Sequence, residues 1–499
     1  MRKLDKRLSL ILNSTAKIGG VYVYSNQQGC DGGRLYYDGS SLVAMNGKVI
    51  AQGSQFSIKE LEVVTATIDL EMIRSYRRDI KNRGIKNDIE DEFSRVYIDY
   101  NLCNLDHLDL TDPQGDIKLH SPEEEIFLGP PLWMWDYLRR SGARGFFLPL
   151  SGGLDSASVA TMVGSMCHLV YKAIEEEKDE KVLSDLRKVV KNDGFTPDSP
   201  RDIAKQVLVT TYMGTKNSST ETLKRAKNLA NDIGCQFFDC EIDEMYESTK
   251  NLFQKITGKE PKYESQGGTY AEDVALQNIQ ARQRMVLSYM MAQLVPWVNE
   301  DKGFLLVLGT ANLDEGLRGY MTKYDCSSAD INPIGGINKS DLKLFLGYSK
   351  DKLGFESLQS ILDAKPSAEL RPIEDKTKDS TQLDEEEMGM TYDELNQFGR
   401  LRKIKGCGPV SMFSELLQIW KHLSPIEISE KVKSFFFFYS INRHKATTVT
   451  PSYFTENYGT DDNRFDHRQF LYNAKWEYQF KKIDELVKYY TEKKSQSQK

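Results

Sequence analysis

The hexapeptide Ser151-Gly-Gly-Leu-Asp-Ser156 constrains the fold of this chain more than any other stretch. It follows an apolar run, Gly145 to Leu150, that predicts a buried strand. It precedes Ala157 to Tyr171, where apolar residues recur at the spacing of a helix. Glycines allow positive φ and a close approach to a ligand, and the first N–H groups of a helix have no partner within it. A strand, a glycine turn and a helix in this order predict a phosphate-binding loop.

The loop lacks the Gly-Lys-Ser/Thr ending of a Walker A loop. It resembles the SGGxDS pyrophosphate loop of the ATP pyrophosphatases, a family that splits ATP between the α and β phosphates. The resemblance implies that the loop holds the departing pyrophosphate while an oxygen of the second substrate becomes adenylated. The alternative is an ordinary Ser/Gly loop with an aspartate at a helix start, where a carboxylate suits the helix dipole.

The residues after the loop alternate between predicted strands and predicted helices. Strands are expected at Gln206 to Met213, Cys235 to Ile242 and Gly303 to Leu308. Helices are expected at Glu175 to Lys191, at Ser219 to Ile233 with Ser218 and Glu221 as a capping box, and at Asn278 to Trp297. This alternation predicts a parallel, doubly wound sheet, which binds ligands at the carboxyl ends of its strands.

The first 115 residues follow a different pattern, with short apolar runs separated by Gly, Asn and Asp. Strands are predicted at Gly20 to Tyr24, Ser41 to Met45, Lys48 to Ala51 and Glu62 to Ile68, and Asn46-Gly47 predicts a hairpin. The runs Gly20 to Gly33 and Gly39 to Gly47 resemble the later part of a nitrilase-type amidase domain. The predicted fold class is therefore α/β: a parallel doubly wound sheet of the ATP pyrophosphatase (adenine nucleotide alpha hydrolase-like) type, preceded by part of a nitrilase-like α-β-β-α domain.

The nitrilase resemblance implies a catalytic Glu, Lys and Cys, all upstream of the matched stretch. In that family the nucleophilic Cys precedes a Glu by two positions, and none of the seven cysteines here does so. We interpret Cys30 as a small buried hydrophobe rather than a substitute nucleophile. We therefore expect the chain to begin inside an amidase domain: either the start of the natural protein is missing here, or this is a form without a working amidase. If the other half of the domain is missing, its sheet is expected to expose apolar surface.

Prolines at 113, 130 and 131 punctuate the connection between the two parts, over Asp116 to Gly145. The predicted domains are 1–117, 118–485 and a disordered tail at 486–499. Leu370 to Met388 is expected to be either a lid or a disordered acidic insert. Helices are expected at Thr391 to Phe398, Pro409 to Leu423 and Ile426 to Tyr439, the last with an aromatic run for a core or a subunit interface.

A set of motifs along the second domain resembles the NAD synthetases. The matching stretches are Ser151 to Ser156, Asn278-Ile-Gln-Ala-Arg-Gln-Arg-Met285, Gly309-Thr310 with Glu315, Lys323-Tyr-Asp with Ala329-Asp330, Asn332-Pro-Ile334 and Lys339. With the amidase-like part and the stretch RGYMTKYDCSSADINPIGG, they resemble the glutamine-dependent NAD⁺ synthetases of eukaryotes in particular. The resemblance covers nearly the whole chain.

The resemblance implies a role for each matched residue. The ATP-binding residues would be Ser151, Gly152, Gly153, Leu154, Asp155, Ser156, Thr310, Lys339 and Ser367. The residues that bind nicotinic acid adenine dinucleotide, the second substrate, would be Arg282, Lys323, Asp330, His444 and Lys445. Ser151 and Asp155 would be catalytic, and Asp155 and Glu315 would ligate Mg²⁺. Independently of the resemblance, a carboxylate that follows the strand at 303–308 could complete a Mg²⁺ site with Asp155.

The implied reaction is the ATP-dependent amidation of nicotinic acid adenine dinucleotide to NAD⁺ through an adenylated intermediate, with release of AMP and pyrophosphate. The nitrogen comes from glutamine in the intact family, and we expect ammonia to supply it here. The family also implies a homo-oligomer. The alternatives are another amidotransferase such as GMP synthetase, an RNA-thiolating relative, or a non-catalytic or truncated subunit that associates with full-length synthetase.

Charge, hydropathy and cysteine content restrict the binding partners and the cellular compartment that the sequence favours. The chain carries 66 Lys and Arg against 73 Asp and Glu, a net charge of −7, so no basic surface for nucleic acid is indicated. An apolar run of the length that spans a membrane does not occur in the sequence. The seven cysteines are odd in number and form no CxxC pair, which favours a reducing, cytoplasmic setting.

Overall fold

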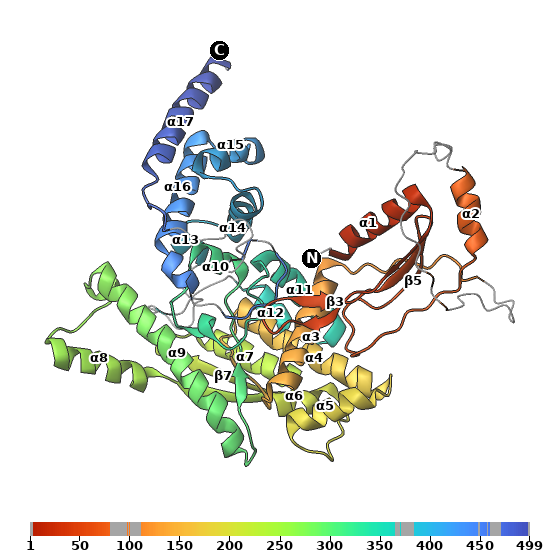
Figure 1. The fold of residues 1–499 in the computed structure, drawn as a ribbon. Helices are drawn as coiled ribbons and strands as arrows, with labels where there is room; N and C mark the ends of the chain where they lie inside the picture. Colours follow the sequence, from red (N-terminus) through yellow and green to blue (C-terminus); the bar gives the residue numbers. More distant parts are fainter. Residues whose placement is uncertain are drawn as a thin grey trace. The chain divides into compact units, whose positions relative to one another are not determined.

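The computed structural model describes residues 3–79, 97, 99, 111–364, 370, 384–447, 450–456, 458–459 and 471–497. It divides the chain into two compact units, which we call the first and second units (Figure 1). The first comprises Met1–Gly29 and Tyr37–Ser121, and the second comprises Cys30–Tyr36 and Pro122–Lys499. The division after Ser121 lies close to the boundary predicted at residue 118.

The first unit is a small α/β layer. A helix, α1 (Lys3–Ile18), packs on an antiparallel sheet of order β1-β4-β5, formed by Val21–Tyr24, Leu42–Met45 and Lys48–Gln52, and α2 (Leu70–Asp79) follows. Three of the four predicted strands are thereby confirmed. The predicted hairpin joins β4 and β5, with φ of 52° at Asn46 and 84° at Gly47, the positive values that a tight two-residue turn requires.

The strand predicted at Glu62 to Ile68 is wrong. The segment has no regular secondary structure, but its residues alternate between exposed and half-buried, which is the pattern that predicts a strand. It forms no ladder, because its backbone pairs with Asp112 at Thr67 only locally, and Leu61 and Val63 remain 80% and 76% exposed. Val23 of β1 is also 73% exposed, in line with the expected apolar surface.

The second unit is built on a four-stranded parallel sheet of order β8-β7-β6-β9. The strands are β6 (Gly145–Pro149), β7 (Leu208–Gly214), β8 (Gln236–Glu241) and β9 (Leu305–Val307), all four as predicted. The helix α9 (Tyr270–Val298) packs on one face through the cluster of Phe147, Val209 and Met285. The helices α4 (Leu154–Glu175), α6 (Pro200–Val207) and α7 (Thr220–Ile233) pack on the other side (Figure 1). The sheet is therefore doubly wound.

The strand order places a ligand site. The chain runs outward from β6 through β7 to β8 and then returns to β9, on the other side of β6. The connections after β6 and β9 therefore leave the sheet in opposite directions, and ligands of open α/β sheets bind at such a point. The hexapeptide 151–156 follows β6, and Gly309 to Glu315 follow β9.

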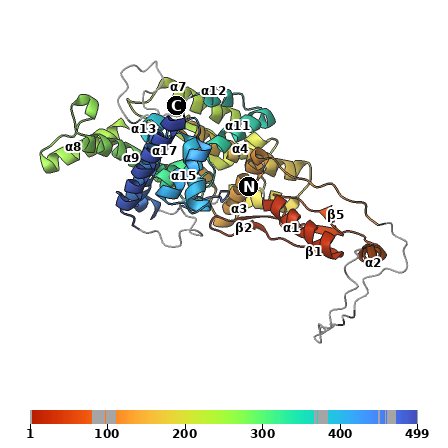
Figure 2. The same cartoon turned by 90° about the horizontal axis from the view of Figure 1, so that it is seen from above.

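The remaining helices of the second unit are mainly C-terminal. They are α3 (Pro122–Ser141), α5 (Glu180–Val190), α8 (Asp243–Thr257), α10 (Leu313–Arg318), α11 (Lys339–Leu353), α12 (Leu358–Leu362), α13 (Asp384–Met388), α14 (Tyr392–Gly399), α15 (Pro409–Ile419), α16 (Pro425–Ile441) and α17 (Glu477–Ser497). Figures 1 and 2 show α15, α16 and α17 side by side, and the aromatic run of α16 lies in their core, with Phe435 and Phe436 fully buried.

Three local expectations differ from the structure. The segment expected as a disordered tail from 486 on belongs to α17, because Leu486 and Val487 pack against the α15–α16 core. Pro130 and Pro131 lie inside α3, where their buried surroundings outweigh the lost N–H groups. The N-cap of α7 is Ser219, whose side chain accepts from the Thr222 N–H, whereas Ser218 accepts from Thr215 in the preceding turn.

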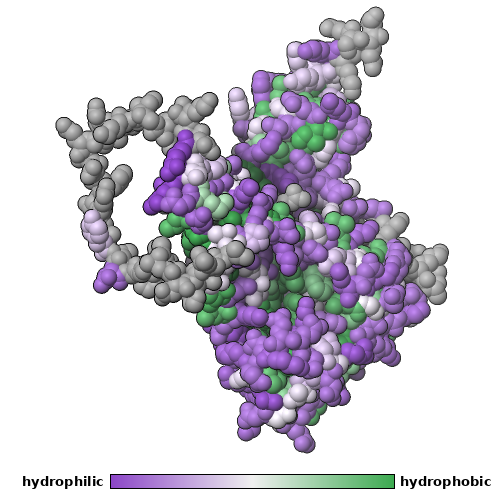
Figure 3. Space-filling view, turned by 90° about the vertical axis from the view of Figure 1, so that its right-hand side faces the viewer, coloured by the Kyte–Doolittle hydropathy of each residue, from purple (hydrophilic) through white to green (hydrophobic). Residues whose placement is uncertain are grey.

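No helix among the residues that the structure describes is long and apolar enough to cross a membrane. On the face of the molecule that Figure 3 presents, hydrophilic residues cover most of the surface and hydrophobic residues form smaller patches between them.

Candidate active site

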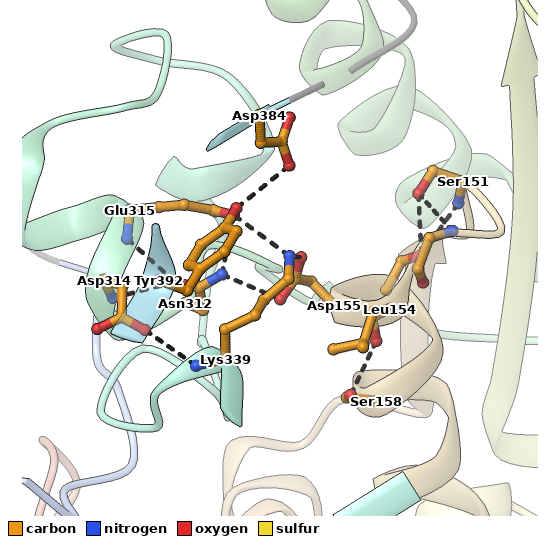
Figure 4. Close-up of polar contacts among 12 residues, drawn as sticks. Ser151, Leu154, Asp155, Ser158, Asn312, Asp314, Glu315, Lys339, Asp384 and Tyr392 are labelled. Carbon is orange, nitrogen blue, oxygen red and sulfur yellow. Dashed lines mark hydrogen bonds and ion pairs between the residues drawn. The ribbon is translucent and has the colours of Figure 1, made fainter. Parts of the chain in front are cut away.

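The loop after β6 is shaped by one glycine and two serines. Gly152 has a φ of +79°, and a Cβ at this position would overlap the Thr222 carbonyl oxygen of α7. The buried Ser156 hydroxyl accepts from the Ser151 N–H at 3.2 Å and lies 3.0 Å from the Ser151 hydroxyl (Figure 4). Both hydroxyls therefore gather at the start of α4, as the sequence predicts, while Ser151 and Gly153 stay exposed.

The loop after β9 faces it with the amide of Asn312 and the carboxylate of Glu315. Asn312 is the N-cap of α10, and its Oδ1 accepts from the N–H groups of Asp314 and Glu315, both at 3.0 Å. Its Nδ2 donates to Asp155 Oδ1 at 3.1 Å and to Glu315 Oε1 at 2.8 Å (Figure 4). Asn312 thus joins the two carboxylates that were predicted as Mg²⁺ ligands.

A buried ammonium completes the cluster. Lys339, the first residue of α11, forms an ion pair with Asp155, and its Nζ lies 3.6 Å from Glu315 Oε1. Burial disfavours its charge, but the carboxylates of Asp155, Glu315 and Asp384 outweigh burial and raise its pKa. Burial, with the nearby Asp155, raises the pKa of Glu315 to about 8, despite the opposing effect of Lys339. The site therefore holds buried carboxyl groups whose charged forms are favoured by the Lys339 ammonium and disfavoured by burial.

A tyrosine and a third carboxylate close the cluster from a later part of the chain. The Tyr392 hydroxyl lies 3.1 Å from Glu315 Oε1 and 3.2 Å from Asp384 Oδ2, and the Lys339 Nζ lies 4.8 Å from the Tyr392 ring centroid. Sequence reasoning missed Asn312, Asp384 and Tyr392. Asn312 carries a local signal, since Asn three residues before Glu is an N-cap pattern. Asp384 and Tyr392 carry none.

The segment expected as a lid or an acidic insert, Leu370 to Met388, is described at its two ends only. The Leu370 carbonyl accepts from Gln280 Nε2 at 2.9 Å, and Asp384 begins α13 at the carboxylate cluster. Residues 371–383 lie outside the described residues, and so does Ser367, one of the predicted ATP-binding residues. Thr310, another, is half-buried in the loop after β9.

The residues predicted to bind the dinucleotide differ in their contacts and in their exposure to solvent. Arg282 of α9 donates to the Lys323 carbonyl at 2.9 Å, and Lys445 Nζ donates to the Gly319 carbonyl at 2.8 Å. Burial, Arg318 and Arg282 together lower the pKa of Lys445, against Asp325, so Lys445 and Arg282 share one electrostatic environment. His444 is exposed beside Lys445.

Asp330 has a structural role in the sheet. Its Oδ2 accepts from the Val307 N–H at 2.8 Å and its Oδ1 from the Tyr289 hydroxyl at 3.0 Å. Both contacts fasten the end of β9 to α9. Sequence reasoning did not anticipate these contacts, because Asp330 lies on an irregular segment far along the chain from Tyr289.

Cys30 has the environment of a structural thiol. Burial and the neighbouring Asp136 carboxylate raise its pKa, so the thiolate that a nucleophile needs is disfavoured. Its backbone N–H donates to Asp136 Oδ2 at 3.1 Å. The environment of Cys30 therefore does not favour a nucleophile, although the residue is half-buried rather than fully buried.

The carboxylate pair suits a Mg²⁺ ion that shares its coordination with phosphate. Within the described ranges, no group of three or more His, Cys, Asp or Glu side chains forms a ready-made metal cluster. Asp155 and Glu315 nevertheless lie within reach of one Lys339 ammonium, so they are close enough for one cation to contact both. Mg²⁺ commonly takes only one or two carboxylates and completes its shell with phosphate and water.

The sheet, its switch point and the loop together define an α/β protein of the ATP pyrophosphatase type. A family model described as NAD synthase matches residues 131–406, and one described as carbon-nitrogen hydrolase matches residues 1–78. The glutamine-dependent NAD(+) synthetase of Saccharomyces cerevisiae is 54% identical over 496 residues, 98% of this chain and 69% of that protein. That of Homo sapiens is 50% identical over 489 residues, with the same shares of both chains.

The fold comparison agrees. A crystal structure of a glutamine-dependent NAD(+) synthetase from Cytophaga hutchinsonii matches with a TM-score of 0.69 at 24% identity, over 97% of this chain and 68% of that chain. The chain belongs to the glutamine-dependent NAD⁺ synthetase family and is a ligase of NAD biosynthesis with a nitrilase-like part. This result excludes the GMP synthetase and RNA-thiolating alternatives.

Proposed function

We propose that the second unit amidates nicotinic acid adenine dinucleotide to NAD⁺ at the expense of ATP. The observation that carries the proposal is the cluster of Asp155, Glu315, Asn312 and Lys339 at the switch point of the sheet. It joins the hexapeptide, through Asp155, to the residues that follow β9 and to the start of α11. Such a cluster combines cation-binding carboxylates with a fixed ammonium, which is what a site that cleaves ATP between two phosphates needs.

The chemistry explains why ATP is required. A carboxylate reacts poorly with ammonia because oxide is a poor leaving group, so the nicotinate oxygen attacks the α-phosphate and pyrophosphate departs. Ammonia then displaces AMP from the acyl adenylate. Ser151, Gly152, Gly153, Leu154 and Ser156 would hold the phosphates, with Thr310, Lys339 and Ser367 as further ATP contacts. Bound by Asp155 and Glu315, Mg²⁺ would neutralise phosphate charge.

The dinucleotide would lie toward Arg282, Lys323 and Lys445. The shared environment of Arg282 and Lys445 supports this, since two cations there would favour a substrate with phosphate groups. His444 and Asp330 complete the proposed set. Asp330 would act through the end of β9 that it holds.

An isotope experiment tests the route through an adenylate. With ¹⁸O in the nicotinate carboxylate, ammonium, ATP and Mg²⁺, we expect one ¹⁸O per AMP formed, measured by mass spectrometry. Formation of ADP and inorganic phosphate, or AMP without label, would contradict attack on the α-phosphate.

We further propose that free ammonium is the nitrogen source for this chain, since none of its cysteines has the setting of an amidase nucleophile. In the family, the names of the relatives specify glutamine. The alternative, a subunit that assembles with full-length synthetase, keeps the same carboxylate cluster but shows no activity alone. We also propose a cytoplasmic setting, because the six cysteines within the described ranges are free.

The long helix α9 supports a homo-oligomer. Its residues Val286, Met290, Leu294 and Trp297 are spaced along one face and are 64%, 53%, 46% and 73% exposed. Contiguous exposed apolar side chains of this kind mark interfaces between proteins. We propose that a second copy of the chain covers them.

Replacing Trp297 by glutamate is expected to lower the molar mass that light scattering measures at micromolar concentration, because a charge would be buried unpaired in the interface. Leu344→Glu, at a leucine of α11 that is 60% exposed, is the matched control and should leave the mass unchanged. An unchanged mass for Trp297→Glu would place the interface elsewhere.

A further inference from the structure

Residues 450–456, which we call the strap, extend the sheet of the second unit beyond β9. Leu308 forms a parallel bridge with Ile331, and Asn332 forms the next one with Ser452. The Asn332 N–H donates to the Pro451 carbonyl at 2.8 Å, and the Tyr453 N–H donates to the Asn332 carbonyl at 3.2 Å. A Cβ at Gly336 would overlap the Tyr453 carbonyl oxygen, so the two segments fit each other closely.

Asn332, the residue that pairs with the strap, also connects to the carboxylate cluster. Asn332, 4% exposed, donates from Nδ2 to the Ala311 carbonyl at 2.8 Å, and its Oδ1 accepts from the Ile334 N–H at 3.1 Å. Ala311 directly precedes Asn312, the residue whose side chain joins the two carboxylates. The Asn332 amide therefore fixes the peptide from which Asn312 projects.

A second contact reaches Lys339. Tyr458, two residues beyond the strap and fully buried, donates to Asp314 Oδ1 at 3.4 Å. The other oxygen of Asp314 accepts from the Lys339 N–H at 3.0 Å. Tyr458 thus holds the start of α11, from which the Lys339 ammonium extends to the carboxylates.

The outer side of the strap is held by residues 30–36. The Phe454 N–H donates to the Arg34 carbonyl at 3.0 Å, and the Arg34 guanidinium lies 5.0 Å from the Phe454 ring centroid. The Tyr453 ring contacts Tyr36 and Trp133, with centroids 6.3 and 6.1 Å away. The strap is therefore fixed on both sides.

We propose that the strap, held by residues 30–36, positions the metal-binding carboxylates and Lys339, and that Asn332 and Tyr458 are positioning residues of this site. The proposal rests on the proposed function for the identity of the metal. Groups that hold metal ligands in place by hydrogen bonds contribute to the affinity for the metal, because a ligand that is free to turn binds the metal less well.

Three variants test the proposal. Asn332→Asp removes the donor to Ala311 and keeps the acceptor for Ile334, Tyr458→Phe removes only the hydroxyl, and Tyr36→Ala loosens the strap from outside. Binding of Mg²⁺ is measured by calorimetry with α,β-methylene-ATP, which cannot be split between the α and β phosphates. We expect the Kd for Mg²⁺ to rise about 10-fold in Asn332→Asp, and by about threefold in Tyr458→Phe and Tyr36→Ala. In turnover with ammonium, the same variants need more Mg²⁺, and the KM for ammonium stays unchanged.

Tyr171→Phe is the matched control, because it removes a hydroxyl bond of 3.0 Å to the Asp198 carbonyl at the surface. It should leave the Kd for Mg²⁺ unchanged. An unchanged Kd in both Asn332→Asp and Tyr458→Phe would overturn the proposal, and an unchanged Kd in Tyr36→Ala would overturn the part assigned to residues 30–36. If Asn332→Asp fails to fold, Tyr458→Phe decides. Since metal binding is measured without turnover, absence of NAD⁺ formation by the unsubstituted chain would count against the proposed function alone.

Discussion

Replacing Asp155 by asparagine is expected to lower the rate of NAD⁺ formation about 10³-fold. Asparagine keeps the size of the side chain and an oxygen that can accept from Asn312. It removes the charge that pairs with Lys339 and that is proposed to bind Mg²⁺. The substitution should therefore lower the rate of catalysis without unfolding the protein. A thermal unfolding curve like that of the unsubstituted chain is expected to confirm that the variant is folded.

The control for this variant is Asp351→Asn, which makes the same chemical change at the exposed end of α11. Its rate should match that of the unsubstituted chain. A loss of less than about 10-fold in Asp155→Asn at saturating Mg²⁺ would mean that Asp155 is not part of the reacting site.

Gly152→Ala is expected to abolish ATP binding and to destabilise the second unit. The residue has a φ of +79°, which costs an alanine about 1 kcal/mol, and the new Cβ would overlap the Thr222 carbonyl oxygen. Relief of that overlap requires the loop to move away from α7, so the total cost should be about 3 kcal/mol. ATP affinity is measured by calorimetry and stability by urea unfolding.

Gly142→Ala separates the cost of the positive φ from the cost of the overlap with another residue. Gly142 has a similar φ of +75°, and a Cβ there would have no atom within 4 Å. This variant should lose only about 1 kcal/mol of unfolding free energy and should bind ATP normally. Normal ATP binding by Gly152→Ala as well would contradict the assignment of the loop to the phosphates.

The parts of the site that follow from local sequence could be predicted, and those that depend on distant contacts could not. Ser151 to Ser156 lie between a strand and a helix that their own apolar periodicity predicts, so the loop follows directly from the local sequence. A carboxylate after β9 could be placed near Asp155 because both follow strands of one parallel sheet, and the family resemblance implied that it is Glu315. Asp384 and Tyr392 reach the same carboxylates from helices with no such relation, so only the folded chain reveals them.

The errors have the same origin. Glu62 to Ile68 has the alternation of a strand, but a strand also needs a neighbour with free backbone groups, which the pattern cannot specify. Pro130 and Pro131 are tolerated in α3 because of the buried surroundings that the helix finds in the folded unit. The contacts that Asp330 makes with Val307 and Tyr289 could not be predicted for the same reason, because both partners lie far from it along the chain. Its role in substrate binding stays a prediction.

The most direct test of the account is NAD⁺ formation by the purified chain with ATP, Mg²⁺ and nicotinic acid adenine dinucleotide. Ammonium is supplied in one reaction and glutamine in the other, and NAD⁺ is measured by an enzymatic cycling assay. We predict NAD⁺ and AMP in equal amounts with ammonium and none with glutamine. Activity with glutamine would contradict the inactive glutaminase half, and absence of both NAD⁺ and AMP in the two reactions would contradict the proposed synthetase and leave the subunit alternative.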